Sequence, residues 1–194
     1  MTDEYKTITN DKIGEGSYTE SKSRFLAFAH HVNNIDDIKS LLSKYKKTYY
    51  DARHICYAYM LGSERTVFRA NDDGEPSNTA GKPLLGQINS NELTDILVIV
   101  VRYYGGINLG SSRLTIAYRT AAALAIKDSI IESLQVKKNF TFCFPYEKTK
   151  EVMKILKEIS PEILQQHFEQ ECSMTVAVRL RDATLLETMI KKIL

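Results

Sequence analysis

The order of hydrophobic and polar residues in the first third of the chain is typical of β-strands followed by a helix. Tyr5–Thr9 and Ser23–Val32 carry β-favouring residues, and the segment Gly14–Gly16 between them predicts a turn. We therefore expect an opening hairpin. Apolar residues then recur at helical spacing over residues 35–45, which predicts a helix.

The middle of the chain combines short strands with two helices around one strongly apolar strand. Strands are expected at Arg53–Leu61 and Thr66–Ala70, and a short helix at Thr79–Asn89. The segment Ile96–Val101 is unbroken, apolar and β-branched, which indicates burial on both faces of a sheet. The alanine-rich segment Ser112–Asp128 predicts a helix whose small residues allow close packing on that sheet.

After a link at residues 133–138, the pattern in the last third of the chain predicts a second, shorter series of strands and helices. The expected elements are a strand at Phe140–Pro145, a helix at Glu147–Ile159, strands at Ile163–Glu171 and Ser173–Arg181, and a helix at Ala183–Leu194. This βαββα order suggests a second small sandwich. We predict an α+β fold with two domains, residues 1–135 and 138–194.

Composition mainly excludes classes of protein. The 194 residues are 43% hydrophobic and carry 26 basic against 24 acidic side chains, so nucleic-acid binding requires a local patch. The start of the chain lacks the basic and apolar segments of a signal peptide, and no apolar run approaches the roughly 18 residues of a membrane span. We expect a cytoplasmic protein with no membrane role.

Cysteine and histidine spacing gives no sign of a metal or redox site. Cys56, Cys143 and Cys172 are odd in number and include no Cys-x-x-Cys pair, so we expect three buried, reduced thiols. No two of the four histidines have the spacing that places two ligands on one helical face. No metal and no cofactor is expected.

An acidic turn after the second short strand is the first candidate for function. Its candidate residues are Asp72, Asp73, Glu75, Thr79 and Lys82. A phosphate loop is rejected because six residues, not four, separate Gly74 from Gly81, and Pro83 stands where a magnesium-binding Ser or Thr belongs. The acidic residues also fail the calcium-loop spacing. The segment is either an Asp-Gly turn or a polar rim that orients a ligand or a partner's basic group.

A glycine turn between the most apolar strand and the alanine-rich helix is the second candidate. Its spacing, G-G-x-x-x-G, is not the dinucleotide fingerprint. Arg113 lies at the positive end of the helix dipole, which is mildly unfavourable, and a bound anion would explain its presence there. The alternative is that the Arg113 side chain extends into solvent and that the turn is only a tight connection. The predicted anion- or nucleic-acid-binding residues are Arg102, Tyr104, Gly105, Gly106, Gly110 and Arg113.

Two longer stretches contain these turns. The first is Asp73-Gly74-Glu75-Pro76 followed by Thr79-Ala80-Gly81-Lys82-Pro83-Leu84-Leu85, and the second is Val101-Arg102-Tyr103-Tyr104-Gly105-Gly106 with Leu109-Gly110. Together they resemble the IMPACT family, specifically its bacterial YigZ-like branch, and the resemblance covers nearly the whole chain, with His54, Tyr57 and Tyr118 in expected contexts. It implies an N-terminal domain like domain 2 of ribosomal protein S5. It also implies a ferredoxin-like C-terminal domain, here without its last strand.

The resemblance implies a role in translation, because eukaryotic members of the family regulate translation initiation. It supplies no catalytic residue, so catalytic residues stay unknown and an enzyme is not the preferred interpretation. We predict a non-catalytic RNA- or ribosome-associated binding protein that regulates translation, with a further translation-regulating protein as a possible partner.

Two alternatives stay open. One is an enzyme of hydrolase type acting on a small anionic substrate, with Asp73 or Glu75 as base and Lys82 or Arg102 holding the anion. The other is a protein-interaction module that acts through residues 138–194.

Overall fold

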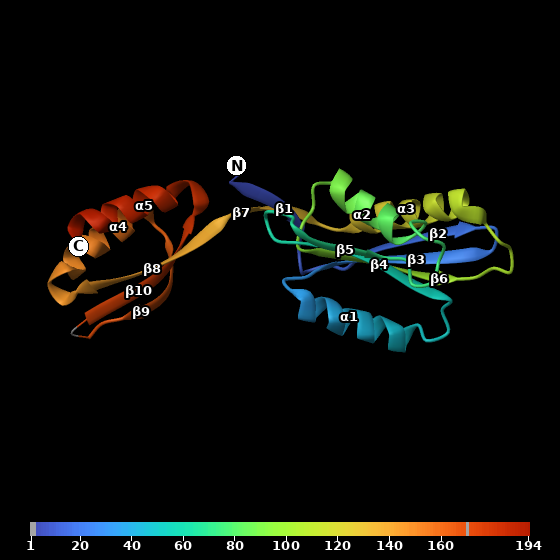
Figure 1. The fold of residues 1–194 in the computed structure, drawn as a ribbon, viewed down its shortest axis with the longest axis horizontal. Coiled ribbons are helices and arrows are strands. Elements are labelled where there is room, and N and C mark those ends of the chain that lie inside the picture. The colour runs from blue at the N-terminus through green and yellow to red at the C-terminus, as the bar shows by residue number, and fades with distance from the viewer. Residues whose placement is uncertain (1–2, 170) are drawn as a thin grey trace. The chain divides into compact units, whose positions relative to one another are not determined.

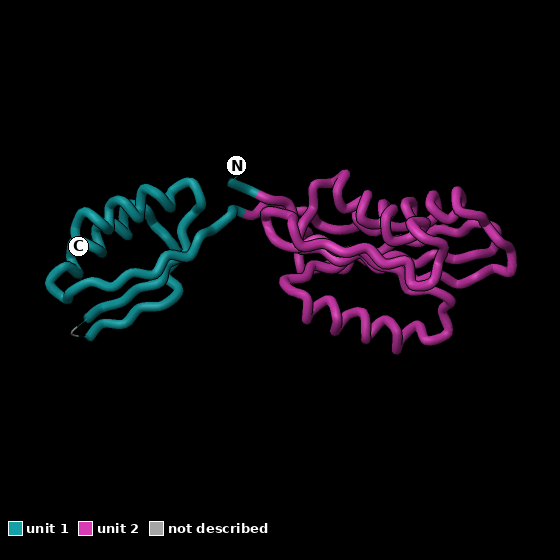
Figure 2. Tube along the Cα trace, viewed as in Figure 1, with its two compact units in different colours: residues 1–4, 135–194 teal, residues 5–134 magenta. Residues whose placement is uncertain are grey.

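The computed structural model describes residues 3–169 and 171–194 and divides the chain into two compact units (Figure 2). The larger unit comprises Tyr5–Leu134, and the smaller unit comprises residues 1–4 and 135–194. Among the described residues, no helix is both long enough and apolar enough to cross a membrane.

A five-stranded antiparallel sheet forms the centre of the larger unit (Figure 1). Its strands, in spatial order, are β2 (Gly14–Glu20), β3 (Ser23–His31), β6 (Ile96–Tyr103), β4 (His54–Leu61) and β5 (Val67–Asn71). The central strand β6 is buried from Ile96 to Arg102. Its unbroken apolar sequence therefore corresponds to the expected burial on both faces.

Helices cover both faces of this sheet (Figure 1). Helix α1 (Ile35–Thr48) packs on one face, and α2 (Gly81–Ser90) and α3 (Gly110–Asp128) pack on the other. Because side chains alternate along a strand, β4 directs Ile55 into the core beneath α1 and Cys56 into the core beneath α2 and α3. The two sides of one strand thus belong to two different cores.

The expected opening hairpin is wrong in its pairing. Strand β1 (Glu4–Ile8) pairs with β7 (Ile131–Gln135), at the other end of the larger unit. The hairpin that does form joins β2 to β3 through Ser21 and Lys22, which both have positive φ.

The glycines at the start of β2 serve close packing instead of a turn. Gly14 and Gly16 both lie in β2, which packs against α3. A side chain at Gly16 would place its Cβ 2.6 Å from the backbone nitrogen of Ala125. Glycine inside a strand often marks such a close backbone approach, so its presence here indicates contact with the helix.

The smaller unit is a three-stranded antiparallel sheet with two helices (Figure 1). Its elements are β8 (Lys137–Pro145), the 3-10 turn η1 (Tyr146–Lys148), α4 (Thr149–Ile159), β9 (Glu162–His167), β10 (Glu171–Arg179) and α5 (Leu180–Ile193). The spatial order β8-β10-β9 is that of a ferredoxin-like domain without its last strand. The α+β fold class is confirmed.

One expectation for this region is wrong, and a second is wrong only in its local structure. Cys143 is exposed, because alternation along β8 directs Phe142 and Phe144 into the core and Cys143 to the opposite face. The expected link at residues 133–138 contains the boundary between the two units, but its residues belong to the end of β7 and the start of β8 instead of a loop.

Candidate functional site

The acidic turn and the glycine turn line the same cleft of the larger unit. Strands β5 and β6 both run antiparallel to β4, so the turns that follow them meet at the first residue of β4, His54. The cleft has a volume of about 520 Å³. Its lining residues include Arg53, His54, Glu75, Arg102, Tyr104 and Gly110.

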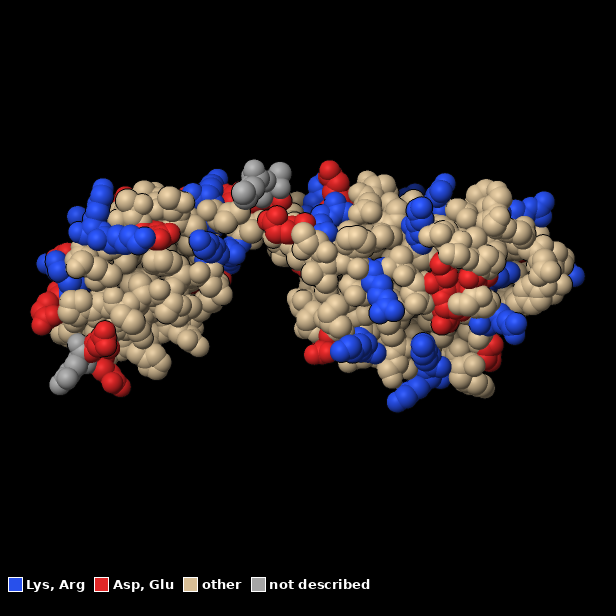
Figure 3. Space-filling model, viewed as in Figure 1, with Lys and Arg blue, Asp and Glu red and all other residues tan. Residues whose placement is uncertain are grey.

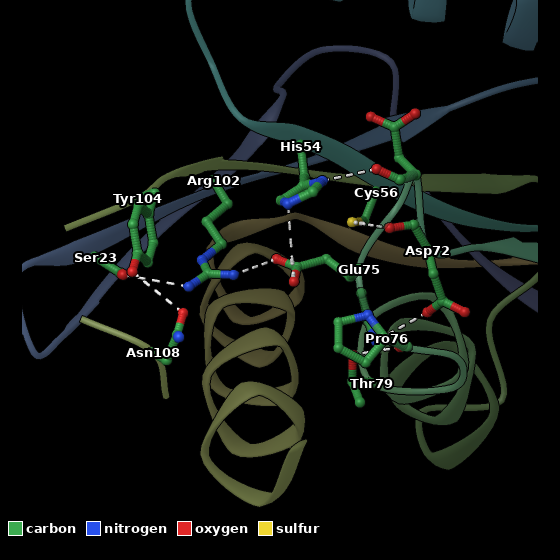
Figure 4. A network of polar contacts seen from close by, with 12 residues as sticks. Ser23, His54, Cys56, Asp72, Glu75, Pro76, Thr79, Arg102, Tyr104 and Asn108 are labelled. Atoms are coloured by element: carbon green, nitrogen blue, oxygen red, sulfur yellow. Dashed lines mark hydrogen bonds and ion pairs between the residues drawn. The ribbon is translucent and has the colours of Figure 1, made fainter. Parts of the chain in front are cut away.

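A buried carboxylate lies at the centre of the polar network in this cleft (Figure 4). Oε1 of Glu75 accepts hydrogen bonds from Nη1 of Arg102 at 2.6 Å and from the hydroxyl of Tyr118 at 2.7 Å. The side chains of Glu75 and Arg102 are only 3% and 6% exposed. Because a buried charge without a partner is strongly destabilising, each of these two residues requires the other.

Arg102 is held in a fixed position by its surroundings. Its guanidinium carbon lies 5.4 Å from the ring centroid of Phe25 and 5.6 Å from that of Tyr104, and Nη2 lies 3.4 Å from Oγ of Ser23. Its Nε is buried and finds no partner among the described residues. Arg102 therefore shapes the cleft as an internal ion pair with Glu75, and its guanidinium is not on the surface.

His54 orients its ring toward the same carboxylate. Its Nδ1 lies 2.7 Å from the carbonyl oxygen of Asp73, which can only accept, so Nδ1 carries a hydrogen. The other nitrogen, Nε2, lies 3.9 Å from Oε2 of Glu75 (Figure 4). In the neutral form of the ring, Nε2 is a hydrogen-bond acceptor, and it faces Oε2 of Glu75, which is also an acceptor.

A thiol and a phenol complete the buried network. The Cys56 thiol donates to the carbonyl oxygen of Asp72 at 3.0 Å and lies 3.3 Å from the Tyr118 hydroxyl. Burial raises the pKa of Cys56, and burial together with neighbouring Cys56 and Glu75 raises the pKa of Tyr118. Both groups stay protonated at neutral pH, so Cys56 does not have the thiolate character of a nucleophile.

Two carboxylates of the acidic turn hold the backbone in place. The Asp72 carboxylate accepts from the backbone N–H groups of Ala80 and Gly81 at the start of α2. It replaces the capping side chain that Ala80 lacks. Asp73 Oδ2 accepts from the backbone N–H of Ile55 at 2.7 Å and so joins the acidic turn to β4.

The remaining residues of the acidic turn lie outside the network around Glu75. The Thr79 hydroxyl donates to the carbonyl oxygen of Pro76 at 2.6 Å, within the turn itself. Lys82 is exposed and is not among the residues that line the cleft. Within the described part of the chain, no group of three or more His, Cys, Asp or Glu side chains is placed to hold a metal ion.

The glycine turn contributes backbone to the cleft. The N–H of Gly105 donates to Oγ of Ser23 at 3.1 Å, and Gly106 has a φ of 81°. Gly110 begins α3 and lines the cleft. Arg113, one turn further along α3, is exposed and is not a lining residue. The structure thus brings Arg102, Tyr104 and Gly110 to one cleft and leaves Arg113 outside its lining.

Several lining or network residues were not predicted from the sequence. Ser23, Arg53 and Asn108 were not singled out, and His54 and Tyr118 had no assigned role. A signal existed for His54, because the order of the antiparallel strands puts the first residue of β4 beside both turns. Ser23 carries no such signal, because its part in the site depends on the pairing of β3 with β6.

The fold and the site define a two-unit α+β protein with a polar cleft built from two sequence motifs. Residues 21–126 match the model of the Impact N-terminal domain, and the chain belongs to the IMPACT family. An IMPACT family member of Haemophilus influenzae is 34% identical over 81% of this chain and 77% of the relative. The IMPACT family member YigZ of Escherichia coli is 29% identical over 81% of this chain and 78% of the relative.

A solved structure supports the fold over the whole chain. The crystal structure of a hypothetical protein aligns with a TM-score of 0.77, covering 99% of this chain and 93% of that chain. Its sequence is 24% identical, so the likeness concerns the fold alone.

Proposed function

We propose that this chain is a non-catalytic RNA- or ribosome-associated binding protein that regulates translation in the cytoplasm, and that its cleft holds an anionic group of the RNA. The observation that carries the proposal is the position of the start of α3. Gly110 and Ser111, the first residues of α3, line a cleft whose charged lining residues are Arg53, Arg102 and Glu75. We also propose that residues 1–135 and residues 138–194 form the two domains of this protein.

The start of α3 is suited to bind an anion. Its N-cap residue Leu109 provides no side-chain hydrogen bond, and its first turn contains no acidic residue. The first N–H groups of a helix have no partner within the helix, and the helix dipole is positive at this end. A phosphate in the cleft would satisfy these groups.

Charge and aromatic surface favour a nucleic acid over other anions. Two arginines and one glutamate line the cleft, and Arg53 is exposed. Tyr104 is 46% exposed at the same cleft, which leaves a ring face available for stacking on a base. On the face shown in Figure 3, acidic side chains gather in one place on the larger unit with Lys and Arg around them. The basic side chains around this acidic cluster, and not the cluster itself, would attract a polyanion.

The test is RNA and ribosomal-subunit binding at low and physiological salt, by electrophoretic mobility and sedimentation. Arg53→Ala should weaken binding several-fold and lower the salt slope by about one, because it removes a phosphate contact from the cleft lining. The matched control is Lys39→Ala, which removes an exposed charge on α1, the helix on the opposite face of the sheet. Absence of binding to RNA and to subunits at both salt concentrations would overturn the proposal.

One observation favours an enzyme as a second candidate. Glu75 Oε2 and His54 Nε2 lie 3.9 Å apart in the cleft, an arrangement that could hold a water molecule for a general base. Turnover of a small phosphate- or carboxylate-bearing substrate that is lost in Glu75→Gln, with folding intact, would support this candidate. A broad substrate panel without turnover would count against it.

A further inference from the structure

Nε2 of His54 and Oε2 of Glu75 face each other in the cleft without a hydrogen bond between them. They are 3.9 Å apart, which is too long for a hydrogen bond. Because Nδ1 of His54 donates to the carbonyl oxygen of Asp73, Nε2 is the acceptor in the neutral form of the ring. Each acceptor therefore needs a donor from another source.

Oε2 of Glu75 lies at the cleft and receives no hydrogen bond from the described residues. The other oxygen, Oε1, accepts from both Arg102 and Tyr118, whereas no described residue donates a hydrogen bond to Oε2. The Glu75 side chain is only 3% exposed. An acceptor on a largely buried side chain that lines a cleft is positioned to receive a hydrogen bond from a molecule that enters the cleft.

A ligand that satisfies both acceptors must present two adjacent donors. An ammonium group and a vicinal diol both do so, and charge distinguishes them. The negative charge of Glu75 is already offset by Arg102 at 2.6 Å, and Arg53 adds a positive charge to the cleft lining. An ammonium group would enter a site with an excess of positive charge, whereas a neutral diol would not.

We infer that the cleft holds a ribose with a free 2′,3′ cis-diol, one hydroxyl donating to Oε2 of Glu75 and the other to Nε2 of His54. This inference rests on the proposed function, because in an RNA strand such a diol occurs at the 3′ end. The cleft volume of about 520 Å³ lies within the range of small-ligand sites. Interior nucleotides have only a 2′ hydroxyl, so the site selects the terminal nucleotide.

The other parts of the cleft suit the other parts of that nucleotide. The uncapped start of α3 at Gly110 and Ser111 is positioned for its phosphate, and the half-exposed ring of Tyr104 for its base. The ring of Tyr104 is oriented by the hydrogen bond from its hydroxyl to Asn108 at 3.1 Å. A free ribonucleoside 5′-monophosphate carries the same three groups, so the test includes one.

The experiment measures the affinity of the full chain for a short labelled single-stranded RNA at fixed salt. Four probes are compared: the RNA with its 3′-terminal cis-diol, the same RNA ending in a 2′,3′-dideoxynucleotide, a circular RNA of the same sequence, and adenosine 5′-monophosphate as competitor. Loss of both hydroxyls should weaken binding about 10- to 100-fold, because one of the two lost hydrogen bonds is to a charged group. The circular RNA should bind as weakly as the dideoxy RNA.

A substitution of His54 tests whether this residue causes the preference for the terminal diol. His54→Phe removes one acceptor and should reduce the preference for the diol to near unity, while Lys39→Ala should leave it unchanged. Glu75→Gln is a less secure test, because it leaves Arg102 buried beside a neutral partner. The comparison of probes on the unaltered protein does not depend on either variant.

The outcomes separate this inference from the proposed function. RNA binding that is equal for the diol, dideoxy and circular forms would overturn the inference and leave RNA binding intact. No binding of any RNA, with no binding of the monophosphate, would overturn both. Binding of the monophosphate without RNA binding would support the diol site and overturn the proposed function. A preference for the terminal diol that His54→Phe does not reduce would overturn the assignment to His54 and Glu75.

Discussion

Oε1 of Glu75 lies 2.6 Å from Nη1 of Arg102, although the two residues are 27 positions apart and belong to the two different motifs of the cleft. Glu75 follows β5 and Arg102 is the second-last residue of β6, and both side chains are buried. The pair therefore connects the two motifs and fixes the width of the cleft between them.

Breaking this pair should destabilise the larger unit strongly. Arg102→Met leaves Glu75 as a buried carboxylate without its cation, which should reduce the free energy of unfolding by about 3–5 kcal/mol. The double variant Glu75→Gln/Arg102→Met should lose less than the sum of the two single variants, because it leaves no unpaired charge. Urea unfolding of the three variants measures this, and additive losses would contradict it.

The Tyr118 hydroxyl should contribute more to the free energy of unfolding than the hydroxyl of a more exposed tyrosine that also donates to a carboxylate. Tyr118→Phe removes a buried hydrogen bond to the Glu75 carboxylate, and we expect a loss of about 1.5–3 kcal/mol. The matched control is Tyr103→Phe, whose hydroxyl donates to the carboxylate of exposed Asp51 at 3.0 Å; its loss should stay below about 1 kcal/mol. Equal losses in thermal or urea unfolding would contradict the buried role of Tyr118.

Two neighbouring glycines of the glycine turn should respond differently to alanine. A Cβ at Gly105 would lie 2.5 Å from the carbonyl oxygen of Lys22, a backbone atom that cannot move aside, so Gly105→Ala should cost about 3 kcal/mol or more. Gly106 has open space around it and only a positive φ, so Gly106→Ala should cost about 1 kcal/mol. Thermal unfolding of the two variants compares them, and the reverse order would refute the close contact at Gly105.

Acid should destabilise the larger unit through a histidine remote from the cleft. Burial, together with the charge of Lys44, lowers the pKa of His30 to about 4, while its ring lies 2.8 Å from the Tyr45 hydroxyl. The unfolded chain protonates this histidine near pH 6.5. Between pH 6.5 and 4 the unfolded state therefore binds the proton and the folded state does not, so stability falls as the pH falls, by at most about 3 kcal/mol.

Urea unfolding at pH 7.5, 5.5 and 4.5 tests this, with His30→Gln alongside. The difference between the two proteins isolates His30 from the other groups that titrate in this range. The native protein should lose more stability on acidification than the variant. An identical pH dependence would show that His30 does not titrate as expected.

The sequence predicted local structure better than long-range pairing. Helix α3 and strand β6 are strongly patterned, and both form close to the predicted positions. The pairing of β1 with β7 was missed because it depends on a contact across the whole unit, and Gly14 and Gly16 gave a misleading turn signal. Those glycines are needed for close packing against a helix that the local sequence does not reveal.

The candidate site was predicted in part. The motifs pointed to Glu75 and Arg102, and the structure brings both to one cleft. Their mutual burial could not be foreseen, because charged residues near glycine turns are usually exposed. The roles of Asp72 and Asp73 as backbone anchors follow from hydrogen bonds to α2 and β4 that spacing alone does not encode.

The pairing of β1 with β7 places the first and last strands of the larger unit side by side. The N–H of Thr9 donates to the carbonyl oxygen of Ile130 at 2.9 Å, so the chain enters and leaves this unit at one point. A unit whose two ends lie close together can be inserted into a loop of another protein without distorting either one. It can also be circularly permuted, for example with new ends at the exposed turn at Gly62, without separating the two motifs of the cleft.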